Sequence, residues 1–181
     1  MSQESGLLLP VASYHIYGET PLFRPVAHVI VPARTKPFNA AAFYQTSPNL
    51  YVFEDDFDQS VGRRPCLRVR QTIFTAPERP YAALLLKKKA NDKCILTGLS
   101  KTHPSKLEDI AGLIKAQPGG KEGFLLNVGS NIIYVEEDED FVVEVSYGWG
   151  DRRWNVNPYW LCEFGPWDAG CQVICPGYMS T

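Results

Sequence analysis

The most restrictive feature of this sequence is a series of short segments in which apolar and polar residues alternate, each bounded by Pro, Gly, Asn or Asp. Alternation of this kind predicts β-strands, because successive side chains of a strand point to opposite faces of its sheet. Fourteen prolines, scattered at the connecting positions, also disfavour an architecture of long helices. We predict strands at residues 11–17, 26–31, 50–54, 66–75, 94–97, 124–128, 132–135, 141–147 and 160–164, and we favour a strand over a helix for residues 81–89.

One segment has the period of a helix instead. The apolar positions that recur at helical spacing are Leu107, Ile110, Ala111 and Ile114. Ser105 and Glu108 have the spacing of a capping box, and the Pro-Gly-Gly run after residue 117 predicts the end of the helix. We therefore predict a β-rich α+β fold, an antiparallel β-sandwich or an open barrel, with one amphipathic helix over residues 105–117 packed on the sheet.

Two hairpins follow this helix in the prediction. The first joins residues 124–128 to 132–135 through Gly129-Ser130-Asn131, residues that tolerate a tight turn. The second leads through the acidic residues 136–140 into the strand at 141–147. Since no internal repeat or Ser-rich linker divides the 181 residues, we predict a single domain over residues 1–181.

The charge balance and the cysteines restrict the partners and the compartment. Lys and Arg number 18 against 20 Asp and Glu, a net charge of -2, so we predict no nucleic-acid partner. No stretch approaches the roughly 20 apolar residues that a membrane-spanning helix needs, so we predict no transmembrane segment. The first residues lack the basic start and the apolar run of a secretion signal, and the five cysteines show no paired spacing. We therefore predict reduced thiols and a cytoplasmic location.

Two histidines offer a candidate for catalysis. The sequence lacks the glycine-rich phosphate loops, the His-Glu-x-x-His motif and the Gly-x-Ser-x-Gly motif. If residues 11–17 pair with residues 26–31, His15 lies opposite His28, with Glu19 just beyond. Two imidazoles and a carboxylate are a ligand set for a divalent metal, as in a small barrel oxygenase or isomerase. Histidines without His-x-His spacing are more often structural, so we predict no metal and no other cofactor and keep this enzyme as the alternative.

Aromatic residues provide the strongest compositional signal. All four tryptophans lie after residue 147, in a stretch rich in Gly, Pro and Asn and interleaved with Arg152 and Arg153. Aromatic rings beside polar donors suit stacking on a sugar, a lipid head group or a protein side chain. The candidate ligand-binding residues are Trp149, Arg152, Arg153, Trp154, Asn155 and Tyr159. The alternative is that the rings form part of the core. We expect Trp149 and Trp154 to be exposed and Trp160 to be buried.

Three short fragments resemble known binding proteins. Residues 17–26 resemble the opening strand and turn of fungal fruit-body lectins. Residues 139–142 and 153–156 resemble the Arg-Trp segment of those lectins and the Trp-Asn-Val segment of the related actinoporins. We carry no site residue over from these families, and the resemblance favours only the class of ligand, a glycan or a phosphocholine head group.

These observations together predict a non-enzymatic domain that binds a ligand or partner through a C-terminal surface of aromatic and arginine residues. The predicted partner is a glycan, a lipid head group or a protein. A further alternative is a protein that forms homo-oligomers through the same aromatic side chains.

Overall fold

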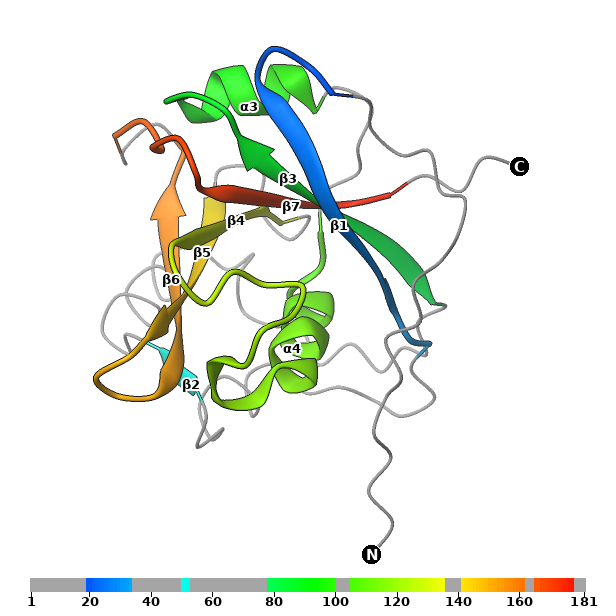
Figure 1. Ribbon diagram of the computed structural model, residues 1–181, viewed down its shortest axis with the longest axis vertical. Coiled ribbons are helices and arrows are strands. Elements are labelled where there is room, and N and C mark those ends of the chain that lie inside the picture. The colour runs from blue at the N-terminus through cyan, green and yellow to red at the C-terminus, as the bar shows by residue number, and fades with distance from the viewer. Residues whose placement is uncertain are drawn as a thin grey trace, which may run out of the picture.

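In the computed structural model, the residues described are 19–33, 50–52, 78–99, 105–135, 141–161 and 165–177. Their strands form one sheet of seven in the order β1-β3-β7-β4-β5-β6-β2 (Figure 1). The strands are β1 (Phe23–Val31), β2 (Leu50–Val52), β3 (Arg79–Leu86), β4 (Ser130–Tyr134), β5 (Phe141–Gly148), β6 (Arg153–Trp160) and β7 (Gln172–Pro176). The helices are α3 (Asp92–Gly98), α4 (Leu107–Ala116) and the short 3-10 helix η2 (Pro118–Gly120). None of the helices in these ranges is long and apolar enough to cross a membrane.

The predicted β-rich α+β fold is confirmed, with two corrections to the strand pairing. The described strands form an open sheet that does not close into a barrel. Four of its six pairings are antiparallel, whereas β4 with β7 and β2 with β6 are parallel. β4 and β6 each pair antiparallel with β5 and so run in the same direction. Since β7 also runs in that direction, the chain crosses back to the start of β4 between the end of β6 and the start of β7. The single-domain prediction for residues 1–181 includes undescribed residues and stays a prediction.

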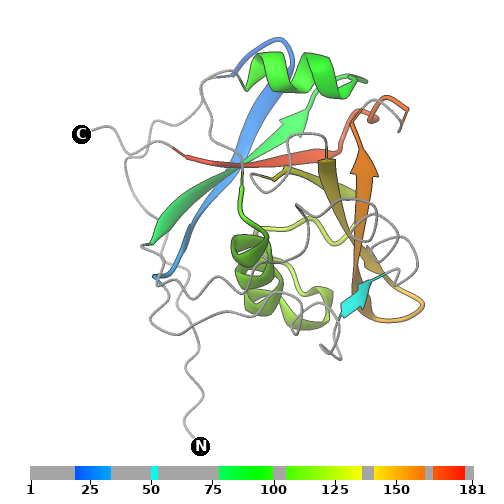
Figure 2. The ribbon, with the colours of Figure 1, turned by 180° about the vertical axis from the view of Figure 1, so that it is seen from behind.

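Both faces of the sheet are covered by helices, and each face has its own apolar core. Figures 1 and 2, seen from opposite sides, place α3 and α4 at opposite ends of the sheet. The α4 core contains the four predicted helix positions, which are 0% to 3% exposed, together with Tyr147, Trp154 and Ile174. The α3 core contains Ile95, Val173 and Trp167. Neighbouring residues of β7 thus belong to different cores, as alternation along a strand requires.

The predicted helix is α4, although its start differs from the prediction. Its first flanking residue is Lys106, which makes no side-chain cap. Ser105 instead forms a bridge with Val135, and its main-chain N–H donates to the carbonyl of Tyr134 at 2.8 Å. The capping box is therefore wrong, because Ser105 is held by the sheet. At the other end the chain turns through Gly119, whose φ of 67° lies in the left-handed region that favours glycine.

Residues 94–97, predicted as a strand, are helical in α3. The side chain of Asn91 accepts a hydrogen bond from the N–H of Cys94 at 2.9 Å and so begins the helix. Asp92 then accepts from the Tyr134 hydroxyl at 2.9 Å and from the Trp167 indole at 2.8 Å. Side-chain hydrogen bonds therefore stabilise residues 94–97 as a helix, and the apolar run alone does not predict these bonds.

The first predicted hairpin is also wrong. Residues 124–128 form no strand, because the amide side chain of Asn131 takes the place of a strand partner for Leu126. Its oxygen accepts from Leu126 N–H at 2.8 Å and its nitrogen donates to the Leu126 carbonyl at 3.0 Å. The predicted strands that begin at residues 26, 50, 81, 132 and 141 are confirmed as β1, β2, β3, β4 and β5. Those at 11–17 and 66–75 lie outside the described residues, and the segment predicted at 160–164 contributes only the last residue of β6.

Candidate functional site

The β5–β6 hairpin carries the predicted binding residues and distributes them over two faces. Its register places Tyr147 opposite Trp154 and Gly148 opposite Arg153. Trp154 belongs to the α4 core, whereas Tyr159 packs against the α3 core. Because side chains alternate along β6, Arg153 and Asn155 lie on the same face as Tyr159. The six predicted residues therefore do not form one surface.

Trp154 is a core residue, so the expectation that it is exposed is wrong. Its side chain is 0% exposed. The indole N–H donates to the carbonyl of Gln117 at 2.8 Å, and the ring meets Tyr147 edge-on with the ring centres 5.3 Å apart. Trp160, expected to be buried, is partly buried and packs against the same core. The alternation of β6 explains both positions.

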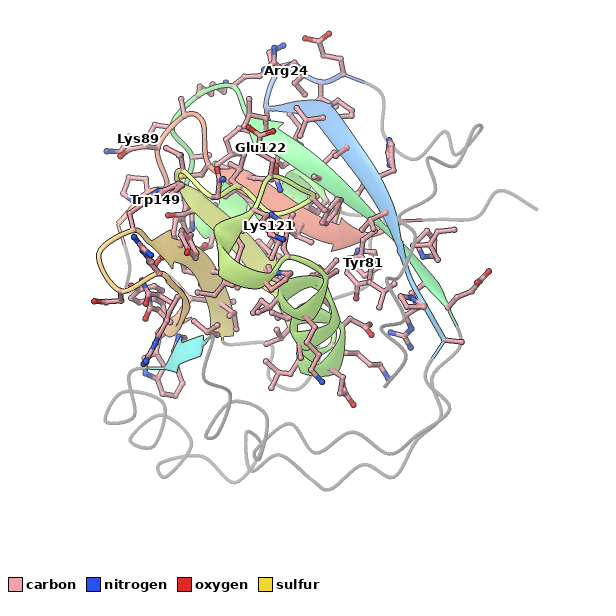
Figure 3. All side chains as sticks on the ribbon, turned by 60° about the horizontal axis from the view of Figure 1, so that its bottom comes forward. Arg24, Tyr81, Lys89, Lys121, Glu122 and Trp149 are labelled. Carbon is pink, nitrogen blue, oxygen red and sulfur yellow. The ribbon has the colours of Figure 1, made fainter. Side chains whose placement is uncertain are left out.

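Trp149 is exposed, as predicted, and it is also held in place. It is 61% exposed at the turn after β5. Its indole N–H donates to the carbonyl of Asn127 at 3.0 Å, and its ring packs edge-on against Tyr147 with centres 5.1 Å apart. Val128, the residue after Asn127, is 72% exposed. Figure 3 shows Trp149 on the side of the molecule away from Tyr81.

Two arginines of the same turn are also exposed, and we call the four exposed residues at this end of the hairpin the turn patch: Val128, Trp149, Arg152 and Arg153. Both guanidinium groups belong to exposed residues. Within the described ranges neither forms an ion pair, since the ion pairs there join Arg79 to Asp109, Lys87 to Glu19 and Lys89 to Asp168. Arg152 has a φ of 55°, so the turn is tight. The turn patch thus combines a fixed apolar ring with unpaired positive charge.

A second group of polar side chains lies on the α3 face of β4, β5 and β6. We call it the polar face: Ser130, Glu144, Ser146, Asn155, Asn157 and Tyr159, all partly buried. Asn157 and Tyr159 donate to Glu144 Oε2 at 3.3 and 3.2 Å, and Ser130 donates to Oε1. The prediction included Asn155 and Tyr159 but missed Glu144 and the serines. The signal for Glu144 and Ser146 was present, because they are the polar alternate positions between the valines of β5.

The structure leaves the alternative metal site untested. His15 lies outside the described residues, and His28 is exposed on β1 opposite Ala82. The Glu19 carboxylate accepts from Lys87 Nζ at 2.9 Å, and this ammonium group holds the pKa of Glu19 below its ordinary value. In the described part of the chain, no three His, Cys, Asp or Glu side chains group together as a metal site.

Cys171, which lies beside the polar face, is not an activated nucleophile. Cys94, Cys171 and Cys175 are free thiols. Burial, the largest cause, raises the pKa of Cys171, so this thiol is neutral at pH 7. A neutral thiol is a weak nucleophile, although Cys171 lies beside the polar face.

Two buried carboxylates hold helices to the sheet. Asp92 binds the side chains of Tyr134 and Trp167, as described above. Asp109 on α4 accepts from the Tyr81 hydroxyl at 2.8 Å and lies 3.7 Å from Arg79 Nη1. Burial first, and then the charge of Asp109, raise the pKa of Tyr81, which therefore remains a neutral donor. Both carboxylates have a structural explanation.

Comparison with known proteins adds no relative: no protein-family model, no curated protein and no solved structure matches this chain.

Proposed function

We propose that this protein is a non-enzymatic binding domain that contacts an anionic lipid surface through the turn patch. The observation that carries the proposal is the state of Trp149, which is 61% exposed although hydrogen bonding and ring packing fix its position. An ordered aromatic side chain loses little conformational entropy when a ligand binds to it. Trp149 is therefore a prepared contact residue.

The chemistry of the turn patch supports a lipid head-group region. Because the indole N–H is already satisfied by Asn127, the rest of the Trp149 ring presents apolar surface, and Val128 adds more. Tryptophan is favoured where apolar and wet environments meet. Arg152 and Arg153 add charges that bind phosphate oxygens, and a basic residue near an anionic membrane contributes about 1 kcal/mol.

Charge and size favour this partner over the other predicted classes. A choline cation would be repelled by Arg152 and Arg153, which form no ion pair with a described carboxylate, so phosphate and carboxylate groups are the favoured contacts. A stable protein interface needs about 800 Å² on each partner, whereas the turn patch has two exposed large apolar side chains. The predicted cytoplasmic location belongs to this proposal, because the cytoplasmic leaflet carries the anionic lipids.

Vesicle sedimentation tests the proposal. We expect the wild-type protein to bind vesicles of phosphatidylcholine and phosphatidylserine and not vesicles of phosphatidylcholine alone. Trp149→Ala should reduce binding, and Arg152→Gln with Arg153→Gln should cost about 2 kcal/mol of binding free energy. Leu96→Ala is the matched control, because Leu96 is an exposed large apolar residue on α3. Its binding should equal that of the wild type.

Two results would contradict the proposal. One is a folded wild-type protein that does not bind the anionic vesicles, and the other is undiminished binding by Trp149→Ala. Size-exclusion chromatography of the same variants tests the oligomer alternative. If the wild type were a dimer and Trp149→Ala a monomer, the turn patch would be a subunit interface.

A further inference from the structure

The polar face presents hydrogen-bonding groups from three neighbouring strands in register. Ser130 of β4 lies opposite Ser146 of β5, and Ser146 lies opposite Asn155 of β6. In the next row Glu144 lies opposite Asn157. All five residues are partly buried, so they are recessed but within reach of solvent.

Glu144 is fixed at the centre of this arrangement. One oxygen accepts from Ser130, and the other accepts from Asn157 Nδ2 at 3.3 Å and from Tyr159 at 3.2 Å. Three donors from two neighbouring strands thus orient one carboxylate. The Glu144 carboxylate and its three donors are therefore ordered before a ligand binds, and this order lowers the entropy cost of ligand binding.

Several polar groups beside Glu144 find no hydrogen-bond partner among the described residues. The Oδ1 atom of Asn157 is buried and accepts no hydrogen bond within the described part of the chain. Leaving a buried polar atom unpaired is unfavourable, and such an atom in a native structure needs an explanation. The side chains of Ser146 and Asn155 likewise take part in no hydrogen bond among the described residues. A hydroxyl and an amide, Ser146 and Asn155, therefore lie side by side with unused hydrogen-bonding capacity.

The backbone leaves room for the amide of Asn155 on this face. A Cβ atom at Gly148, opposite Arg153, would lie 3.0 Å from Asn155 Nδ2. Because Gly148 has no side chain, the Asn155 amide can extend over the neighbouring strand. The glycine thus keeps this end of the polar face open.

The charges restrict the ligand. The central group is a carboxylate whose described donors, Ser130, Asn157 and Tyr159, are all neutral, so an anionic ligand next to it is unfavourable although Arg153 lies at the end of the same face. The carboxylate oxygens are already surrounded by donors, which disfavours a metal cation. The remaining groups are amides and hydroxyls, which both donate and accept hydrogen bonds. Hydroxyl groups on a neutral ligand complement all of them.

From this pattern we propose that the polar face binds a neutral saccharide, with the partly buried Ser146 hydroxyl and Asn155 amide bonded to its hydroxyl groups. This site is distinct from the turn patch. Trp149 packs against Tyr147, whose side chain belongs to the α4 core, whereas the polar face lies on the α3 face of the same hairpin. Arg153 lies on the α3 face as well, so Trp149 is the residue of the turn patch whose substitution tests that patch without touching the polar face.

The test uses an array of neutral glycans ending in mannose, galactose or N-acetylglucosamine, together with sialylated and sulfated glycans. We expect the wild-type protein to retain neutral glycans and not acidic ones. Calorimetric titration with the methyl glycoside of the retained terminal sugar then compares variants. Asn155→Ala and Ser146→Ala should each weaken binding by about tenfold, because each removes a hydrogen bond to the ligand.

The controls separate this site from the fold and from the turn patch. The side chains of Asn155 and Ser146 make no hydrogen bond among the described residues, so both variants should unfold at the wild-type temperature. Trp149→Ala should keep the affinity for the glycoside even where it has lost vesicle binding. Failure to bind any neutral glycan, or equal affinity in Asn155→Ala, Ser146→Ala and the wild type, would overturn the inference.

Discussion

Trp154 donates its indole N–H to the carbonyl of Gln117 at 2.8 Å and so joins β6 to the segment that follows α4. The neighbouring Gly120 lies against the ring of Tyr147, where a Cβ atom would come within 2.4 Å. The hairpin, the turn after α4 and the two rings therefore pack as one unit. Trp149 rests on this unit through Tyr147, which explains why an exposed side chain has a fixed position.

Trp154→Ala should lower the free energy of unfolding by about 3 to 5 kcal/mol, because it removes a fully buried ring. Trp149→Ala should lower it by less than about 1 kcal/mol, since that ring is mainly exposed. Urea denaturation of the two variants measures the difference. Equal losses of stability would mean that Trp149 is a packing residue and not a contact residue.

Asp92→Ala should destabilise the protein by about 3 kcal/mol, because the buried donors of Tyr134 and Trp167 both lose their acceptor. Thermal denaturation measures this loss. The matched control is Asp168→Ala, which breaks an exposed ion pair with Lys89 and should change stability by less than about 1 kcal/mol. A neutral effect of Asp92→Ala would show that α3 is held by its apolar contacts alone.

The stability of the protein should fall with rising pH in a way that depends on Tyr81. Burial and Asp109 raise the pKa of Tyr81 in the folded state, so the folded protein holds this proton more tightly than the unfolded chain. The resulting stabilisation is present below the ordinary tyrosine pKa of about 10 and is lost as the pH rises above it.

Tyr81→Phe tests this dependence. At pH 7 the variant should be less stable by about 1 to 3 kcal/mol, because it loses the hydrogen bond to Asp109. Above about pH 10 its free energy of unfolding should fall less steeply than that of the wild type. Parallel pH curves from denaturant titrations would contradict the assignment.

Ile114→Ala should cost about 2 to 5 kcal/mol, because the side chain lies in the α4 core at 3% exposure. Its neighbour Lys115 is exposed, so Lys115→Ala should change stability by less than about 0.5 kcal/mol. Denaturant titration of this pair measures the predicted orientation of the helix. A small effect at Ile114 would show that another face of α4 packs on the sheet.

Secondary structure is predicted best from the sequence where one hydrophobic periodicity continues over several helical turns or along a whole strand. The apolar spacing in α4 covers about three turns of helix, and the alternation in β5 covers a whole strand, so both elements were recognised. The same rule applied to β6 would have placed Trp154 inside, because Trp154 and Val156 alternate with Arg153 and Asn155. The aromatic and arginine composition of β6 instead predicts a binding surface.

The misassigned segments depend on side chains that meet across the fold. The side-chain amide of Asn131 binds the backbone of Leu126. The side-chain amide of Asn91 accepts from the N–H of Cys94 and begins α3. Composition contains no indication of which amide finds which backbone group. The polar face depends in the same way on the β4–β5–β6 register, which places Ser130 and Tyr159 within reach of Glu144.

Fluorescence quenching by lipids with brominated acyl chains is the most direct measurement of membrane contact through the turn patch. Trp154 and Trp167 are 0% and 3% exposed and Trp160 is partly buried, so a quencher in the bilayer should reach Trp149 in preference. We expect vesicles of phosphatidylcholine and brominated phosphatidylserine to quench the wild-type protein much more strongly than Trp149→Phe. Equal quenching of both proteins, or vesicle-bound wild-type protein without quenching, would contradict membrane contact through Trp149.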